Sequence, residues 1–141
     1  MEQTTASSTS PTDQSSTVDT VVEAISFVSA YVDDYEQALR FYSETLGLEK
    51  AFDMSANSCY FKIGNDGGLY LEGGNTPVAM DSKSIRPAFT LKVGSASAFH
   101  RKLEQAGTVM IHRAPELMGN DHYWFQFRDP AGNILEALGG V

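Results

Sequence analysis

The sequence predicts an α+β fold made of two tandem βαβββ modules. The order of one strand, one helix and three further strands can be traced twice along the 141 residues. Each predicted helix ends at a glycine, the residue best suited to the left-handed position after a helix. The spacing between Val32 and Tyr42 in the first half equals that between Val93 and Leu103 in the second half. The two halves therefore repeat one arrangement.

The first half begins with a predicted strand over residues 24–32, where β-branched and aromatic residues alternate with small ones. Asp34 and Gln37 then have the spacing of a capping box, and apolar residues at helical spacing continue the helix to Gly47. Three short strands complete the module, over residues 48–52, 59–63 and 69–72. The turn-forming residues 65–68 join the last two strands.

The second half repeats this order. It predicts a strand, a helix and three further strands, over residues 87–93, 95–106, 108–112, 124–128 and 134–138. The helix ends at Gly107, and residues 113–121 are expected to form a loop. The last two strands flank the sequence Asp-Pro-Ala-Gly-Asn, which favours a β-hairpin.

The amino-terminal segment is expected to lie outside this fold. Eleven of the first twenty residues are Ser or Thr, so little apolar surface is present to offset the entropy of ordering the chain. We expect a disordered tail over residues 1–21 and one folded domain over residues 22–141. The domain divides into a first module, a polar linker and a second module, at about 23–74, 75–85 and 86–138.

Charge and composition narrow the function classes. The net charge is −8, with 18 acidic and 10 basic residues, so nucleic acid and anionic membranes are expected to be repelled. A cationic ligand would be attracted, although acidity also serves solubility alone. No apolar run approaches the ~18 residues of a membrane span. Cys59, the single cysteine, fits a reducing compartment, and a cytoplasmic protein is expected.

Two sequence motifs resemble a known family. Residues 31–48, YVDDYEQALRFYSETLGL, resemble its V-x-D…A-x-x-F-Y…L-G pattern, and residues 129–136, DPAGNILE, resemble its D-P-x-G-N-x-x-E. The family is the vicinal oxygen chelate superfamily, which includes glyoxalase I, extradiol dioxygenases, fosfomycin-resistance enzymes and bleomycin-resistance proteins. The resemblance covers about residues 23–138. It implies curved mixed sheets around a cavity, in which four side chains hold a metal ion.

The resemblance also shows which residues occupy the four metal-ligand positions. Glu136 matches the last of them. The other three fall on Phe27, Tyr70 and Ala88, with Glu72 as a substitute for Tyr70 after a register shift. A divalent ion needs several nitrogen, oxygen or sulfur donors that converge on one point. No cofactor is therefore predicted. A divalent metal remains the alternative, held in a rearranged site by Glu136 with His122 or His112.

Strand parity predicts the rest of the cavity wall if Glu136 faces inward. The expected ligand-binding residues are Phe27, Ser29, Tyr31, Tyr70, Ala88, Thr90, Trp124, Gln126 and Glu136. Such a wall suits a planar or apolar organic ligand held by a few hydrogen bonds. The competing interpretation is that the aromatic rings pack on one another and leave no cavity. His100, on the second helix, is expected to face solvent.

Glu136 is the candidate catalytic residue. Burial among aromatic rings would favour a protonated carboxyl group and suit it to proton transfer near neutral pH. Glu136 would otherwise bind a cationic group. A third interpretation makes it a relic without a role, hydrogen-bonded to Gln126, Tyr70 or Lys92.

Three functions follow from these residues. The first is a metal-independent binding protein of the bleomycin-resistance type, which sequesters an aromatic or cationic organic molecule. The second is a metal-dependent glyoxalase-type lyase, isomerase or dioxygenase with a rearranged ligand set. The third is a metal-free enzyme with Glu136 as acid or base. Small members of the family complete their cavities as dimers, so the resemblance also implies a homodimer.

Overall fold

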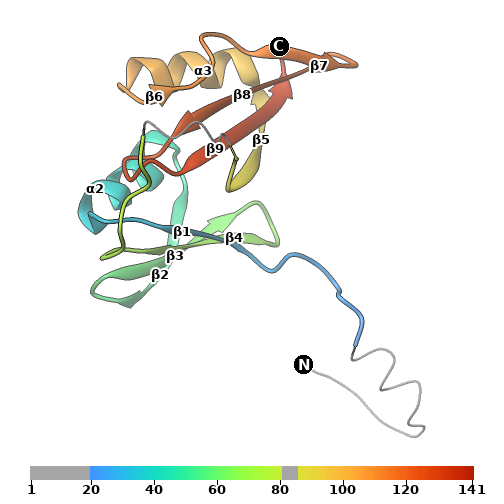
Figure 1. The fold of residues 1–141 in the computed structure, drawn as a ribbon. Coiled ribbons are helices and arrows are strands. Elements are labelled where there is room, and N and C mark those ends of the chain that lie inside the picture. Colours follow the sequence, from blue (N-terminus) through green and yellow to red (C-terminus); the bar gives the residue numbers. More distant parts are fainter. Residues whose placement is uncertain (1–19, 81–85) are drawn as a thin grey trace, which may run out of the picture.

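The computed structural model describes residues 20–80 and 86–141. Most of the predicted tail and part of the predicted linker therefore lie outside the described residues. The described chain forms two sheets, one from each module, with the helices packed against them (Figure 1). The predicted pair of βαβββ modules is confirmed, and the fold is open rather than a closed barrel.

The first module contains four strands and one helical segment. Strand β1 (Val28–Tyr31) is parallel to β4 (Gly67–Glu72), and β4 is antiparallel to β3, as β3 is to β2. The order across the sheet is β1-β4-β3-β2. The remaining elements are α2 (Tyr35–Arg40), η1 (Phe41–Thr45), β2 (Glu49–Ser55) and β3 (Ser58–Ile63).

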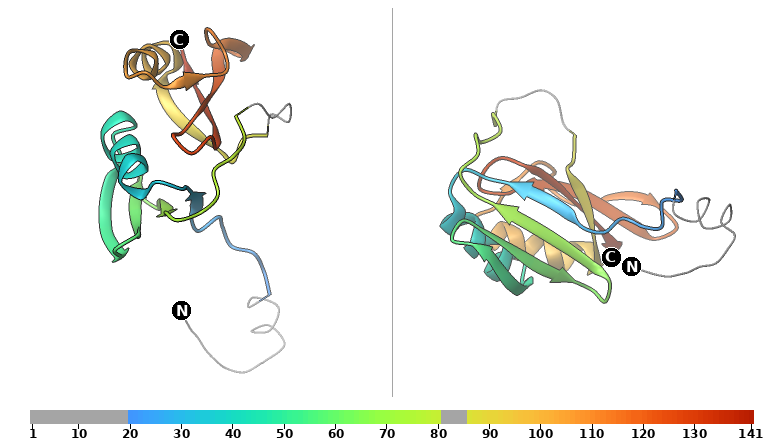
Figure 2. Two further views of the ribbon diagram at one scale, coloured as in Figure 1. Left: turned by 60° about the vertical axis from the view of Figure 1, so that its left-hand side comes forward. Right: turned by 90° about the horizontal axis from the view of Figure 1, so that it is seen from below.

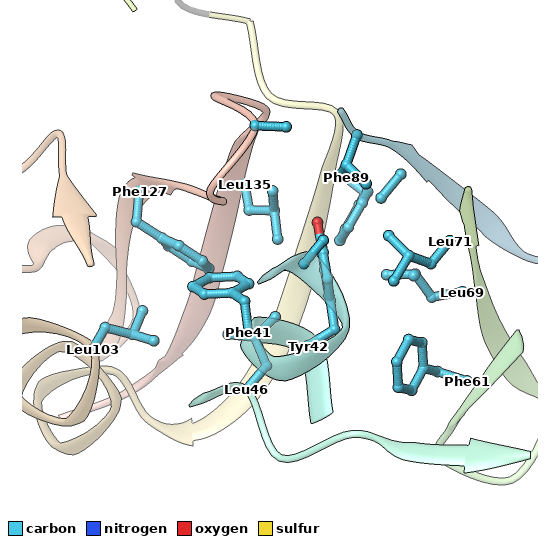
Figure 3. Close-up of a cluster of buried hydrophobic side chains, with 14 of the residues drawn as sticks. Phe41, Tyr42, Leu46, Phe61, Leu69, Leu71, Phe89, Leu103, Phe127 and Leu135 are labelled. Atoms are coloured by element: carbon cyan, nitrogen blue, oxygen red, sulfur yellow. The ribbon is translucent and has the colours of Figure 1, made fainter. Parts of the chain in front are cut away.

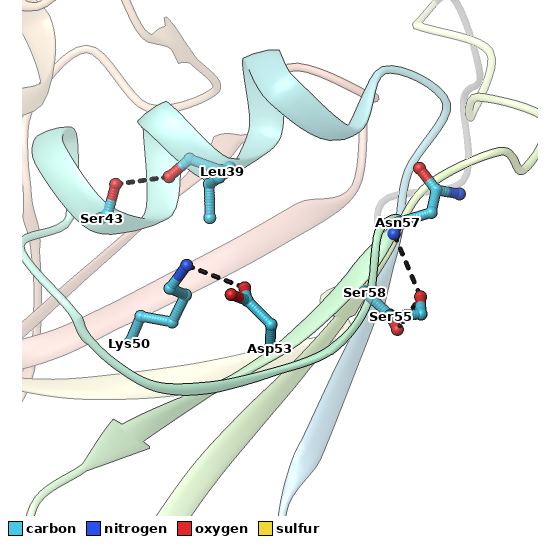
Figure 4. Close-up of polar contacts among 7 residues, drawn as sticks. All are labelled: Leu39, Ser43, Lys50, Asp53, Ser55, Asn57 and Ser58. Carbon is cyan, nitrogen blue, oxygen red and sulfur yellow. Dashed lines mark hydrogen bonds and ion pairs between the residues drawn. The ribbon is translucent and has the colours of Figure 1, made fainter.

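The first helix begins as the sequence predicts and then changes its winding. Asp34 caps it by accepting a hydrogen bond from the backbone N–H of Gln37, at 3.1 Å. The last turn is the π-helical η1, where the Ser43 hydroxyl donates to the Leu39 carbonyl (Figure 4). Gly47 follows with φ +76°, a left-handed conformation that glycine adopts without strain.

The second module repeats the arrangement with one additional strand. It contains β5 (Phe89–Ser95), α3 (Ala96–Gln105), β6 (Val109–Met110), β7 (Glu116–Gly119), β8 (His122–Arg128) and β9 (Ile134–Gly140). The order is β5-β9-β8-β6, and β7 pairs with the other end of β8. Strands β6 and β7 together take the place that β2 has in the first module.

Two sequence-based predictions are corrected here. Residues 113–121 were expected to form only a loop, but they contain β7. The backbone of residues 116–119 pairs with β8, which makes this segment a strand. The first strand begins at Val28 rather than at residue 24. The preceding segment extends away from the sheets, and Val22 and Ile25 are 90% and 83% exposed (Figure 2). An alternating pattern alone does not make a strand where no neighbouring strand is available.

One hydrophobic core joins the two modules. Phe61, Leu69 and Leu71 line it from the first sheet, and Phe127 and Leu135 line it from the second. The η1 segment lies between these groups and buries its aromatic pair in the same core (Figure 3). The modules therefore share one interior. None of the helices formed by residues 20–80 and 86–141 is long and apolar enough to cross a membrane.

A buried hydrogen bond also connects the modules. The Tyr42 hydroxyl in η1 donates to Asp129 Oδ2 at 2.7 Å, and both side chains are buried. The other Asp129 oxygen accepts from the backbone N–H groups of Ala131 and Asn133, which closes the turn before β9. Burial raises the pKa of Asp129, although these hydrogen bonds oppose the rise. The Asp-Pro-Ala-Gly-Asn sequence thus builds both a hairpin turn and a tie between the modules.

Candidate functional site

Glu136 forms a polar row with Thr90 and Gln126 across the second sheet. Strand pairing places Thr90 and Gln126 on either side of Glu136. The Thr90 hydroxyl donates to Glu136 Oε1 at 2.8 Å, and the Gln126 amide donates to Oε2 at 3.1 Å. Each carboxylate oxygen thus has one protein donor and a lone pair left for a ligand. The sequence predicted a hydrogen bond from Gln126 to Glu136 as one of several alternatives, and the structure contains this bond. The hydrogen bond from Thr90 to Glu136 was not predicted.

An aromatic and acidic group lies next to this row on the same face. Trp124 is two residues before Gln126 on β8, and Trp124 pairs with Glu116 on β7. The His112 and Trp124 rings meet edge to face at 4.7 Å. His112 Nδ1 accepts from the Gln126 backbone N–H at 3.0 Å, so its Nε2 carries the proton in the neutral ring. That nitrogen lies 3.7 Å from Glu116 Oε2.

The first sheet carries aromatic side chains at the corresponding positions. Ser29 and Tyr60 pair with Tyr70 across the strands just as Thr90 and Gln126 pair with Glu136. Tyr31 and Phe27 contact Tyr70 edge to face, at centroid separations of 6.2 and 6.5 Å. The Tyr60 ring, which strand parity alone did not select, contacts Phe27 at 5.8 Å.

These rings form a surface rather than a sealed core. Phe52 on β2 extends the row by stacking on Tyr60, with centroids 5.4 Å apart and planes nearly parallel. Phe27, Tyr31 and Phe52 remain about half exposed, at 48%, 50% and 53%. The register of β2 against β3 brings Phe52 beside Tyr60, and only the folded structure supplies that register. The aromatic side chains are therefore available to a ligand or to a second protein surface.

The structure sorts the predicted wall into two groups on separate sheets. Thr90, Gln126, Glu136 and Trp124 lie on the second sheet, Ser29, Tyr31 and Tyr70 lie on the first, and Phe27 immediately precedes β1. Ala88 immediately precedes β5, where its backbone N–H donates to the Ile134 carbonyl. Phe27 and Thr90 both line a mostly apolar cleft of about 520 Å³ between the modules. One member of each group thus borders this cleft.

The residues present do not fit a divalent metal. Phe27 and Ala88 have no donor atoms in their side chains. The Tyr70 hydroxyl donates to Glu72 Oε1 at 2.7 Å, and this hydrogen bond to a carboxylate raises the pKa of Tyr70, which disfavours a phenolate ligand. Among residues 20–80 and 86–141, no three His, Cys, Asp or Glu side chains converge as a metal site would require.

Each histidine of the rearranged metal site uses its Nδ1 within the protein. His122 Nδ1 donates to the Asn120 carbonyl at 2.9 Å, in the turn that precedes β8. His112 Nδ1 accepts from the backbone of Gln126, as described above. His100 is 4% exposed rather than solvated, because α3 turns it inward to contact Phe125 and bond the His112 carbonyl at 2.9 Å. That bond gives His100 a structural role beneath the site.

Comparison with known proteins identifies the family. The family model of the Glyoxalase/Bleomycin resistance protein/Dioxygenase superfamily matches residues 24–137. The chain belongs to this superfamily. The metallothiol transferase FosB of Shouchella clausii is 29% identical to it over 129 residues, which cover 86% of this chain and 83% of FosB.

Solved structures of superfamily proteins show the same fold. Lactoylglutathione lyase from Agrobacterium tumefaciens superimposes with a TM-score of 0.64 at 22% identity, over 84% of this chain and 95% of the lyase. The fosfomycin resistance protein FosX from Listeria monocytogenes superimposes with a TM-score of 0.68 at 15% identity, over 86% of this chain and 96% of FosX. At these identities the likeness establishes the fold alone.

Proposed function

We propose that this superfamily member is a metal-independent small-molecule-binding protein that holds an aromatic or cationic organic ligand. The observation that carries the proposal is the polar row of Thr90, Glu136 and Gln126 beside Trp124. It stands where the resemblance places a metal site, with a carboxylate oriented by two neutral donors. A site of this kind binds through hydrogen bonds and ring contacts.

The charges of the site support a cationic ligand. Two carboxylates, Glu136 and Glu116, lie on either side of Trp124 on one face. A cation held over an indole ring gains about 0.5–2 kcal/mol, depending on how far it is desolvated. The net charge of −8 adds a long-range attraction. Sequestration of such a molecule, as in bleomycin resistance, is the biological role that these features favour.

Titration with cationic aromatic compounds tests this proposal directly. Trp124 is the single tryptophan, so its fluorescence reports binding at this face without interference. N-methylquinolinium is expected to quench it saturably, and Glu136→Gln to weaken binding about tenfold, which corresponds to about 1.4 kcal/mol. Glu104→Gln, on the exposed part of α3, is the matched control and should bind as the wild type does. The absence of quenching by a panel of such cations would contradict the proposal.

Two enzyme functions remain as alternatives. The similarity to a protein named metallothiol transferase favours metal-dependent chemistry, whereas the misfit of the ligand positions argues against it. We expect neither EDTA nor added Ni²⁺, Zn²⁺ or Mn²⁺ to change the melting temperature or the quenching. Stoichiometric metal in protein purified without chelators would favour the metal-dependent function over the metal-independent one. The second alternative, in which Glu136 is an acid or base, requires turnover that Glu136→Gln abolishes while binding persists.

We also propose that the protein works as a cytoplasmic homodimer. Within residues 20–80 and 86–141, β1 and β5 are edge strands, and two of the half-exposed rings, Phe27 and Tyr31, lie at the β1 edge. A second copy would cover this apolar surface, which favours association. The buried thiol of Cys59 is compatible with a reducing compartment. Light scattering on the purified chain measures the oligomeric state, and a monomer at micromolar concentration would contradict this proposal.

A further inference from the structure

The face that carries Glu136 continues into a hollow with the opposite charge. This hollow measures about 430 Å³ and is lined by Thr90, Lys92, Val93, Gly94, His122, Leu138, Gly139 and Gly140. Thr90 belongs to both places, because its hydroxyl donates to Glu136. The binding face therefore extends along β5 and β9, beyond the polar row and toward the carboxyl ends of these strands.

Glycines create this hollow. Gly94, Gly139 and Gly140 line it, beside the irregularity between Lys92 and Ser95 in the pairing of β5 with β9. A Cβ atom placed on Gly94 would meet no atom within 4 Å. The absence of side chains at these positions leaves space for a ligand group beside the polar row.

The charged groups around the hollow are basic. Lys92 pairs with Leu138 on β9, two residue pairs beyond Thr90 and Glu136 and on the same face, so Lys92 and Glu136 are diagonal neighbours across the two strands. Within residues 20–80 and 86–141, Lys92 takes part in neither of the two ion pairs. His122 uses its Nδ1 proton toward the Asn120 carbonyl, so Nε2 of the neutral ring is an acceptor. A ligand anion would find the Lys92 ammonium as its donor here.

We propose that the ligand is a zwitterion with a planar or apolar body, an inference that rests on the proposed function. Its cationic group binds Glu136, its anionic group binds Lys92, and its body lies against Leu138 and Trp124. Row spacing along the strands sets the separation of the two charges. The geometry thus favours a zwitterion over a simple cation, which gains no contact with Lys92, and over a simple anion, which Glu136 and Glu116 would repel.

Three matched probes test this inference. 4-(Aminomethyl)benzoate carries both charges on a planar ring, its methyl ester carries only the cation, and 4-methylbenzoate carries only the anion. Titrations followed by Trp124 fluorescence and calorimetry should give the zwitterion an affinity at least tenfold higher than that of either single-charge probe. Lys92→Met should lower the zwitterion affinity to that of the ester and leave the ester unchanged, whereas Lys92→Arg should retain the preference.

Control variants distinguish the zwitterion inference from the cation-binding function on which it rests. Lys102→Met removes a charge of the same sign from α3 and should change no affinity. Melting temperatures of all variants verify that they are folded. Equal binding of the ester and the zwitterion, with the ester still dependent on Glu136, would overturn the zwitterion inference and leave the cation-binding proposal standing. Absence of binding by all three probes to the wild-type chain would overturn both.

Discussion

The two modules have the same backbone pairing but present different chemistry on corresponding positions. In the first module Ser29 and Tyr60 flank Tyr70, whereas in the second Thr90 and Gln126 flank Glu136. The opposite faces of the two sheets are alike, because both bury leucine and phenylalanine side chains in the shared core. The buried face therefore maintains the fold, and the other face is free to become aromatic in one module and polar in the other.

Removal of Asp129, whose hydrogen bond with Tyr42 connects the modules, should have the largest effect on the free energy of unfolding. Asp129→Ala leaves the buried Tyr42 hydroxyl and two backbone N–H groups without their acceptor, and the Asn133 amide keeps only the Tyr31 carbonyl. Because each unsatisfied buried donor costs about 1–3 kcal/mol, a loss of about 3–5 kcal/mol is expected in urea unfolding followed by circular dichroism. Tyr42→Phe, which removes one donor only, should cost about 1 kcal/mol. A similar cost for both variants would show that Asp129 does not organise the turn.

Glycine substitutions compare the tolerance of the two modules. A Cβ atom on Gly139 would collide with the Val93 carbonyl oxygen, a backbone atom of the adjacent strand. One on Gly68 would collide with the Tyr60 ring, which can turn aside. We expect Gly139→Ala to lower the free energy of unfolding by about 2–3 kcal/mol and Gly68→Ala by about 1 kcal/mol, within the range for overpacking. The reverse order of melting temperatures would mean that the aromatic surface is the more rigid one.

An exposed ion pair of the first module should show the smallest effect. Lys50 Nζ and Asp53 Oδ1 are 2.8 Å apart on the outer strand β2 (Figure 4), and this contact raises the pKa of Lys50. Water and salt screen such a pair. Lys50→Met should therefore leave the unfolding midpoint within experimental error at physiological salt. A measurable loss that disappears at 1 M salt would indicate that the pair is more shielded than its exposure suggests.

The sequence predicts the repeated fold well because the fold depends on local signals. Capping at Asp34, the glycine after each helix and the hairpin around residues 129–133 act over a few residues and agree with one another. The additional strand β7 was missed because its pairing with β8 compensates for a weak local pattern. His100 was misassigned because its position on α3 does not reveal the His112 carbonyl beneath it.

The candidate site was predicted less completely, for a physical reason. Strand parity identified Thr90, Gln126 and Glu136 as residues of one face, which their hydrogen bonds confirm. It did not select Phe52 or Tyr60, since their contacts depend on the register of β2 and β3, with its two irregularities. Nor did it reveal the hollow beside Lys92, because a hollow arises from side chains that glycine lacks.

The π-helical segment η1 has a consequence for how the protein folds. It places Phe41 and Tyr42 in the core that both sheets line, so neither module can complete its interior alone. Half of the chain, expressed by itself, would expose this core and leave Tyr42 or Asp129 without its partner. We therefore expect the two modules to unfold as one cooperative unit. Native-state hydrogen exchange should give the slowest amides of β4 and β9 the same opening free energy.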